Sequence, residues 1–292
     1  MIPRVTHQTI QQSTLANLQG SLSAMAALQS KMSSGKNISV PSDDPGAASD
    51  MLRLRGDQRA IAQYKRNASD ADSWLTTVDT AITGSLATLR RARDLTMQGG
   101  DGALGSTSRE ALATEIDGLR ASLLGQANTT YVGRTVFAGT SDAGVAFDAS
   151  YSWTGTGASV DRRVGATSTV RVDADGAAVF GTGSDSVFAL LDDISATLRA
   201  GGDPTTQLDA IDTRMDAMLS QLSGVGARHK QVLDTQSALL SSELDVKSHL
   251  SGIEDIDLAE VILELQTQEV AYNGALGAAA KVLQPTLLDF LR

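Results

Sequence analysis

Apolar residues recur at alternating steps of three and four residues along most of this chain. Near the N-terminus this spacing is kept by Leu15, Leu18, Leu22, Met25, Gln29 and Met32. A second run passes through Ile61, Tyr64, Ala68, Ala71, Leu75, Val78, Ile82, Ser85, Leu89 and Ala92. Such spacing aligns the apolar side chains on one stripe of an α-helix, so each run predicts an amphipathic helix with a narrow seam.

The middle of the chain has a different pattern. A shorter helical run through Leu112, Ile116, Leu119 and Leu123 is followed by a glycine-rich segment from about residue 139 to residue 186. Within it, Val170 and Val172 alternate with polar neighbours, as in a strand with one buried face. The following Asp175-Gly176 pair is a strong turn signal. We therefore expect a small β-rich insert with a hairpin at this pair.

The longest helical run follows the insert and then changes phase. Its seam is formed by Leu208, Ile211, Met215, Met218, Leu222, Val225, His229, Val232, Gln236, Leu239, Glu243, Val246, Leu250 and Ile253. One helix over that span would be roughly 70 Å long. A new seam then begins out of phase, with Leu258, Ile262, Leu265, Glu269, Tyr272, Leu276, Ala279 and Leu283. Such a slip predicts a redirected or loosened helix and a separate packing environment for the C-terminal run.

Together these runs predict a mainly α fold. We expect an elongated antiparallel helical bundle or coiled coil built from both chain ends, with the β-rich insert in its middle. The segments are an N-terminal assembly helix and linker (1–41), N-terminal rod helices (42–138), the insert (139–186), a C-terminal rod helix (187–255) and a C-terminal assembly helix (256–292).

The two terminal helices are the candidate site. Both are rich in small residues and Gln, and isolated helices of this quality are marginal in water. One alternative is a simple hairpin in which each terminal helix is the other's partner. The other is that they are loosely ordered alone and bury their seams on assembly with neighbouring subunits. The assembly interface predicted on this basis consists of Leu15, Leu18, Leu22, Met25, Met32, Leu258, Ile262, Leu265, Tyr272, Leu276 and Leu283.

Composition narrows the function classes. The net charge is −10 and no basic cluster occurs, which disfavours nucleic acid as a partner. There are no cysteines, which removes thiolate catalysis and thiolate metal sites. The N-terminus lacks the apolar core of a secretory signal, and no apolar stretch is long enough to insert into a membrane.

The stretch SSGKNISVPSDDPGAAS, residues 33–49, resembles neither a phosphate loop nor a calcium loop in its spacing. Each of its special residues fits a linker between two helices. Gly35 suits the left-handed turn after a helix, while Asp43 or Asp44 can cap the next helix and Pro45 suits its first position. We interpret these four residues as a helix-linker signature.

No other set of residues indicates catalysis. The three histidines lack ligand spacing, no serine lies in a nucleophile elbow, and Glu254-Asp255 is most simply a helix-end or solvated pair. We expect no enzyme activity, catalytic residue, cofactor, metal or small-molecule substrate. An enzymatic or glycan-binding insert is the alternative, but only Tyr151 and Trp153 would provide an aromatic surface there.

Several short motifs, specific only in combination, resemble the flagellin superfamily. They are Arg4-Val5-Thr6, Ser34-Gly35-Lys36, residues 41–45, Tyr64, Asn67, Trp74-Leu75, Asn128, residues 131–134, residues 137–139, residues 226–228, residues 250–257, Tyr272, Leu276, Lys281-Val282 and residues 287–291. The Arg-Val-Thr opening and the Leu-Leu-Asp-Phe-Leu ending are similar to the junction type of the family more than to filament flagellin. The segment around Tyr151 to Gly155 departs from the family pattern.

The resemblance implies a structural adaptor that joins the flagellar hook to the filament through its terminal coiled-coil helices. The implied partners are a hook-side junction protein, flagellin, copies of the chain itself in a ring, and a flagellar export chaperone. The implied location is extracellular, at the hook–filament junction, after type III export without a cleaved signal peptide. A major or minor filament flagellin is the alternative.

Overall fold

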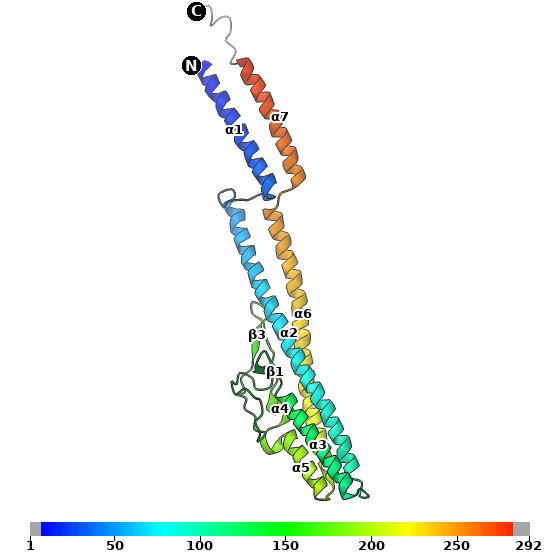
Figure 1. Cartoon of the computed structure of the whole chain (residues 1–292). Coiled ribbons are helices and arrows are strands. Elements are labelled where there is room, and N and C mark those ends of the chain that lie inside the picture. Colours follow the sequence, from blue (N-terminus) through cyan, green and yellow to red (C-terminus); the bar gives the residue numbers. More distant parts are fainter. Residues whose placement is uncertain (1–6, 283–292) are drawn as a thin grey trace, which may run out of the picture. The chain divides into compact units, whose positions relative to one another are not determined.

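A computed structural model describes residues 7–282 of the chain, and most of them are helical. The helices are α1 (His7–Ser34), α2 (Pro45–Gly99), α3 (Ser106–Ala127), α4 (Gly176–Phe180), α5 (Val187–Arg199), α6 (Leu208–Glu254) and α7 (Leu258–Val282). The strands are β1 (Thr130–Tyr131), β2 (Arg134–Thr135), β3 (Asp161–Arg163) and β4 (Thr169–Arg171). Figure 1 shows the long helices and the smaller strand-containing part of the chain. The strands pair antiparallel as β1 with β2 and β3 with β4, and this confirms the predicted mainly α fold with a β-containing insert.

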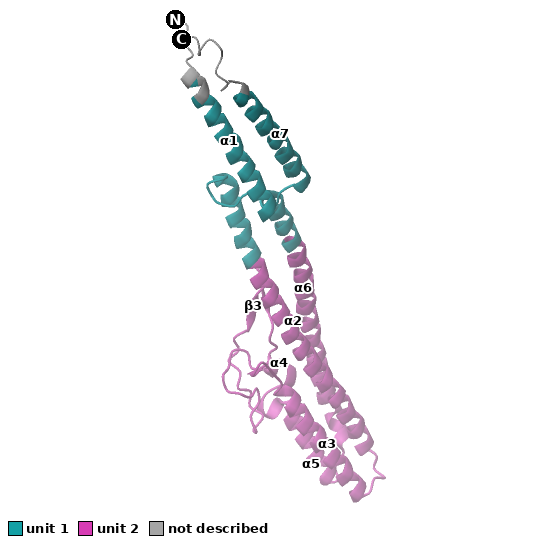
Figure 2. Ribbon diagram, turned by 45° about the horizontal axis from the view of Figure 1, so that its top comes forward, with its two compact units in different colours: residues 1–59, 243–292 teal, residues 60–242 magenta. Residues whose placement is uncertain are grey.

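The chain divides into two compact units, coloured separately in Figure 2. Unit 1 contains residues 1–59 and 243–292, and unit 2 contains residues 60–242. Both α2 and α6 contribute residues to each unit. The segment boundaries at residues 41 and 255 were inferred from sequence motifs, whereas the compact units are defined by packing. These boundaries therefore stay a prediction.

Unit 2 is held together by the seams that the sequence predicts for α2 and α6. Ala68, Ala71, Leu75, Val78, Ile82, Ser85, Leu89 and Ala92 are buried on α2, and Ile211, Met218, Val225 and Val232 on α6. Two polar contacts show that α2 and α6 run antiparallel. Arg93, late in α2, contacts Asp212, early in α6, whereas Ala68, earlier in α2, contacts Gln236, later in α6. Trp74 is also buried in this core.

The insert packs into the same core as α2, α3, α5 and α6 through a cluster of aromatic side chains. Phe137, Phe147, Phe180 and Phe188 are buried and meet with ring centroids between 5.2 and 5.8 Å apart. Tyr151 and Trp153 are partly buried against this core, and their polar atoms reach Asp192 and the Phe137 carbonyl. They are therefore packing residues rather than an exposed aromatic surface.

The predicted hairpin at Asp175-Gly176 is wrong. The hairpin is formed by β3 and β4, whose register pairs Arg162 with Val170, and its turn lies before β4. The Asp175 carboxylate instead accepts hydrogen bonds from the amides of Ala177 and Ala178 and caps α4. Gly176 is needed for close approach, since a Cβ there would lie 2.6 Å from the Phe137 carbonyl oxygen.

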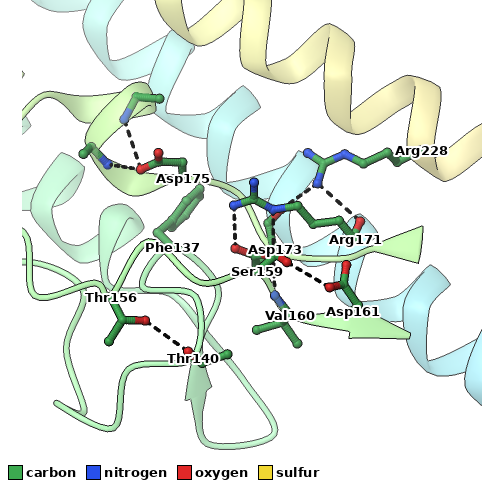
Figure 3. Close-up of polar contacts among 12 residues, drawn as sticks. Phe137, Thr140, Thr156, Ser159, Val160, Asp161, Arg171, Asp173, Asp175 and Arg228 are labelled. Atoms are coloured by element: carbon green, nitrogen blue, oxygen red, sulfur yellow. Dashed lines mark hydrogen bonds and ion pairs between the residues drawn. The ribbon is translucent and has the colours of Figure 1, made fainter. Parts of the chain in front are cut away.

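A buried polar cluster fastens the hairpin to α6 (Figure 3). Asp173 is 1% exposed, receives two hydrogen bonds of 2.9 Å from Arg171 and accepts a third from the Val160 amide. Arg228 on α6 donates to the carbonyl oxygens of Asp173 and Arg171. Burial lowers the pKa of Arg228, because desolvation disfavours its charged form. The alternation of β4 and the segment after it is as predicted, with Val170 and Val172 buried.

Candidate assembly interface

The terminal helices α1 and α7 lie side by side in unit 1 and run antiparallel. The Gln268 side chain donates to the Ser21 carbonyl, while the Ile256 amide donates to the Gly35 carbonyl at the other end of the pair. The shared seam consists of Thr14, Leu18, Ser21, Met25 and Leu28 on α1, and Val261, Leu265, Gln268, Tyr272, Ala275 and Ala279 on α7. These positions keep the three-four spacing on both helices, which is why the two faces match.

This seam is thin. Among the described side chains of α1 and α7, Leu28, Val261 and Ala279 are the buried ones, at 8%, 9% and 5% exposure. The remaining seam positions are half-buried and include Thr14, Ser21 and Gln268. Polar and small residues contribute little apolar area, so the pair gains far less from burial than the core of unit 2 does.

The residues of the predicted interface divide into two sets. Leu18, Met25, Leu265 and Tyr272 are half-buried in the α1–α7 seam. The exposed set, which we call the outer stripe, consists of Leu15, Leu22 and Met32 on α1 and Leu258, Ile262 and Leu276 on α7. Their exposed fractions run from 38% at Met32 to 60% at Leu15. Leu283 lies outside the described residues.

Helical geometry explains this division. Leu15 and Leu22 each follow a seam residue by one position, which turns the side chain by about 100° around the helix. They therefore form a second stripe beside the first, and the same holds for Ile262 beside Val261 and Leu276 beside Ala275. One partner helix covers only one stripe, so the second stays open.

Two exposed apolar residues of α7 were missed by the sequence analysis. Leu263 is 66% exposed and Val270 is 73% exposed. They are seven residues apart and thus share a face of α7 that belongs to neither stripe. Their seven-residue spacing in the sequence could have identified this face. With them, α7 carries apolar side chains on several sides, which is typical of a helix that becomes buried.

The four signature residues lie at the two ends of the linker between α1 and α2 and within it. Gly35 has φ of +69°, and its amide donates to the Lys31 carbonyl, which ends α1. The Asp44 carboxylate accepts from the amides of Gly46 and Ala47 and so caps α2, whose first residue is Pro45. Asp43 accepts from the amides of Ser39 and Val40, and these hydrogen bonds lower its pKa.

The α1–α2 linker and the short segment between α6 and α7 meet at Glu254, and we call this meeting point the joint. Glu254 is 5% exposed, and its carboxylate accepts from Lys36 and, at 2.9 Å, from Arg55. Its carbonyl accepts from the Asn37 amide at 2.7 Å, and Lys36 and Asp255 form an antiparallel bridge. Glu254 is at a helix end, as predicted, since it is the last residue of α6. The expectation that it is solvated is wrong, because the linker after α1 folds over it.

Within the described residues, no group of three or more His, Asp or Glu side chains could hold a metal ion. His229 contacts Asp72 at 2.6 Å. The described helices also include none that is long and apolar enough to cross a membrane. Asp257 caps α7 by accepting from the amides of Ala259 and Glu260, and α6 and α7 are thereby separate helices where the sequence predicts a change of phase.

Comparison with known proteins agrees with this architecture. Residues 5–142 match the bacterial flagellin N-terminal helical region. Flagellar hook-associated protein 3 of Salmonella typhimurium is 27% identical over 93% of this chain and 94% of its own length. Flagellin of Bacillus subtilis is 25% identical over 99% of this chain and all of its own length.

Solved structures show the same fold. A putative flagellar hook-associated protein from Vibrio parahaemolyticus superposes with a TM-score of 0.68 at 23% identity, covering 73% of this chain and 100% of that one. FlgL of Bacillus cereus has a TM-score of 0.61 at 20% identity, covering 68% of this chain and 99% of that one. The N-terminal part of the chain is therefore similar to bacterial flagellins, and along nearly its whole length the chain is similar to flagellar hook-associated protein 3.

Proposed function

We propose that this protein is a non-enzymatic adaptor that joins the flagellar hook to the flagellin filament. The observation that carries this proposal is the open outer stripe on α1 and α7, in a chain whose relatives over nearly the whole length are flagellar structural proteins. The six large apolar side chains of the outer stripe do not stabilise a monomer, because they are exposed to solvent. Neighbouring subunits would cover them.

The energetics favour contacts with several neighbours at once. Burying one exposed Leu or Ile side chain contributes about 1.5–3 kcal/mol. Association itself costs an estimated 4–15 kcal/mol. The outer stripe together with Leu263 and Val270 provides apolar contacts on more than one face of the pair. Such contacts are heterologous and can close into a ring of copies.

The proposed partners follow from this position. Copies of the chain would lie beside one another in the ring, with a hook-side junction protein below and flagellin above. Leu15 and Leu22 on α1, and Leu258, Ile262 and Leu276 on α7, are the contacts we assign to these neighbours. Before assembly the same stripe needs cover, which is the role we assign to an export chaperone during type III export without a cleaved signal peptide.

Immunogold labelling of intact flagella tests the location. We expect a single band of label at the base of the filament. A strain that lacks the gene is expected to keep its hooks and to release flagellin into the medium, because the filament would have no attachment site on the hook. Normal filaments in that strain would contradict the proposal.

A filament flagellin is the second candidate, and the similarity to Bacillus subtilis flagellin over 99% of this chain is the observation in its favour. The same labelling experiment separates the two functions. A filament subunit would be labelled along the whole filament, whereas the junction adaptor would be labelled only at its base.

A further inference from the structure

A cavity of about 360 Å³ lies in unit 1, between the α1–α2 linker and the first turns of α2. Its wall is apolar where Ile38, Val40, Met51 and Leu52 line it. Its rim is formed by Lys36, Arg55 and Glu254. The proposed function does not use this cavity, which we call the linker pocket.

The linker pocket combines an apolar interior with a fixed excess of positive charge. Ile38 and Met51 are buried, while Val40 is 49% and Leu52 is 67% exposed at its edge. Two cations, Lys36 and Arg55, share the single carboxylate of Glu254, and both are nearly half exposed. One positive charge is therefore left over at the rim. An apolar group that carries a nearby carboxylate is complementary to this arrangement.

The chain itself contains a segment of this chemistry beyond its described part. Residues 283–292 read LQPTLLDFLR. Leu287, Leu288 and Phe290 offer large apolar side chains, and Asp289 places a carboxylate among them. Residues 287–291 of this segment, whose one charged side chain is Asp289, therefore match the linker pocket both in their apolar groups and in their charge.

The segment of the same copy cannot reach the pocket. Helix α7 runs from the joint at Glu254 to Val282, and its 25 residues are about 37 Å long. From Val282 to Phe290 a fully extended backbone spans at most about 29 Å. As long as α7 is helical, Phe290 falls short of its own linker pocket. The occupant must come from another copy.

We propose that residues 287–291 of one copy dock in the linker pocket of a neighbouring copy. Phe290 and the two leucines fill the apolar part, and Asp289 faces Lys36 and Arg55. This contact rests on the proposed function, because it requires copies to assemble side by side. It would link each subunit to the next through its joint, in addition to the outer stripe.

Disulfide trapping tests the contact directly, because the natural chain contains no cysteine. Two full-length variants, Leu52→Cys and Phe290→Cys, are produced together in one strain, and the isolated flagella are treated with a mild oxidant. We expect a disulfide-linked dimer that disappears on reduction. Leu233→Cys paired with Phe290→Cys is the matched control, since Leu233 is also an exposed leucine, on α6. That pair is expected to give no dimer.

A second pair, Val40→Cys with Phe290→Cys, guards against a local defect caused by the change at Leu52. No dimer from either pair in flagella that contain both variants would overturn the proposal, as would an equal yield from the Leu233 control. A chain carrying both Leu52→Cys and Phe290→Cys should also form no internal disulfide as a monomer, and an internal disulfide would contradict the reach argument. Immunogold labelling of the natural chain reports separately on the proposed function, so the two can fail independently.

Discussion

Glu254 shows most clearly what local sequence patterns leave out. Its partners Lys36 and Arg55 are 218 and 199 residues away along the chain, so no local signal marks it as a buried residue. The signature residues of the linker are the opposite case. Gly35, Asp44 and Pro45 act on amides and carbonyls within a few residues, and their roles could therefore be predicted from the sequence alone.

Replacement of Glu254 by Gln is predicted to loosen the joint of unit 1. Gln keeps the shape but removes the charge that Lys36 and Arg55 share, at a cost of about 1.5–3 kcal/mol. The amides of Asn37 and Ile256, which bond across the joint, should then exchange with solvent about 10- to 100-fold faster. Hydrogen exchange measured by mass spectrometry checks this.

Glu269→Gln is the control for that change, because Glu269 is exposed on α7 and lies more than three helical turns beyond the joint. Exchange at the joint should stay at the natural rate in this variant. Unchanged exchange in Glu254→Gln would show that the buried carboxylate does not hold the joint.

At the scale of elements, helical spacing predicted which segments are helices but not which stripe of each terminal helix faces its partner. Leu15 and Leu18 fit the same three-four pattern, and only the position of α7 separates the exposed one from the half-buried one. The insert was predicted less well. Asp175-Gly176 has the same local preference in a hairpin turn and at a helix N-terminus, and packing against Phe137 decided the outcome.

Leu22→Asp and Leu276→Asp are each predicted to abolish incorporation into flagella while the helices of unit 2 stay folded. Leu22 and Leu276 are 46% and 42% exposed, so the isolated chain tolerates a charge there. In an assembled apolar interface the unpaired carboxylate would cost about 3 kcal/mol or more, a loss of at least about 100-fold in association. Quantitative blotting of isolated flagella and circular dichroism of the purified chain measure the two effects.

Matched controls are available on the same helices. Asn17→Asp on α1 and Ala271→Asp on α7 add the same charge at exposed positions that precede a seam residue by one, on the side away from the outer stripe. These variants should be incorporated at near-natural levels. Incorporation of the leucine variants at the level of these controls would contradict the assignment of the outer stripe to neighbouring subunits, and so would a fall in helix content.

At the scale of the molecule, the two compact units differ in how completely each buries its own seams. Unit 2 has continuous buried stripes on α2 and α6, joined by the aromatic cluster of the insert. The α1–α7 pair buries three side chains in its described part and leaves the outer stripe open. The sequence predicted this contrast in outline, because both terminal helices are rich in small residues and Gln. Pairing of the two helices with each other was one of its alternatives, but it could not predict that the pair keeps a free face.

Limited proteolysis of the purified, unassembled full chain tests this contrast most directly. Segments with few buried contacts open locally at low free-energy cost and are cut first. We predict early cleavage within α1 and α7 and a resistant fragment that contains residues 60–242. If α1 and α7 instead stayed intact for as long as that fragment, the terminal pair would be complete on its own, and it would need no neighbours.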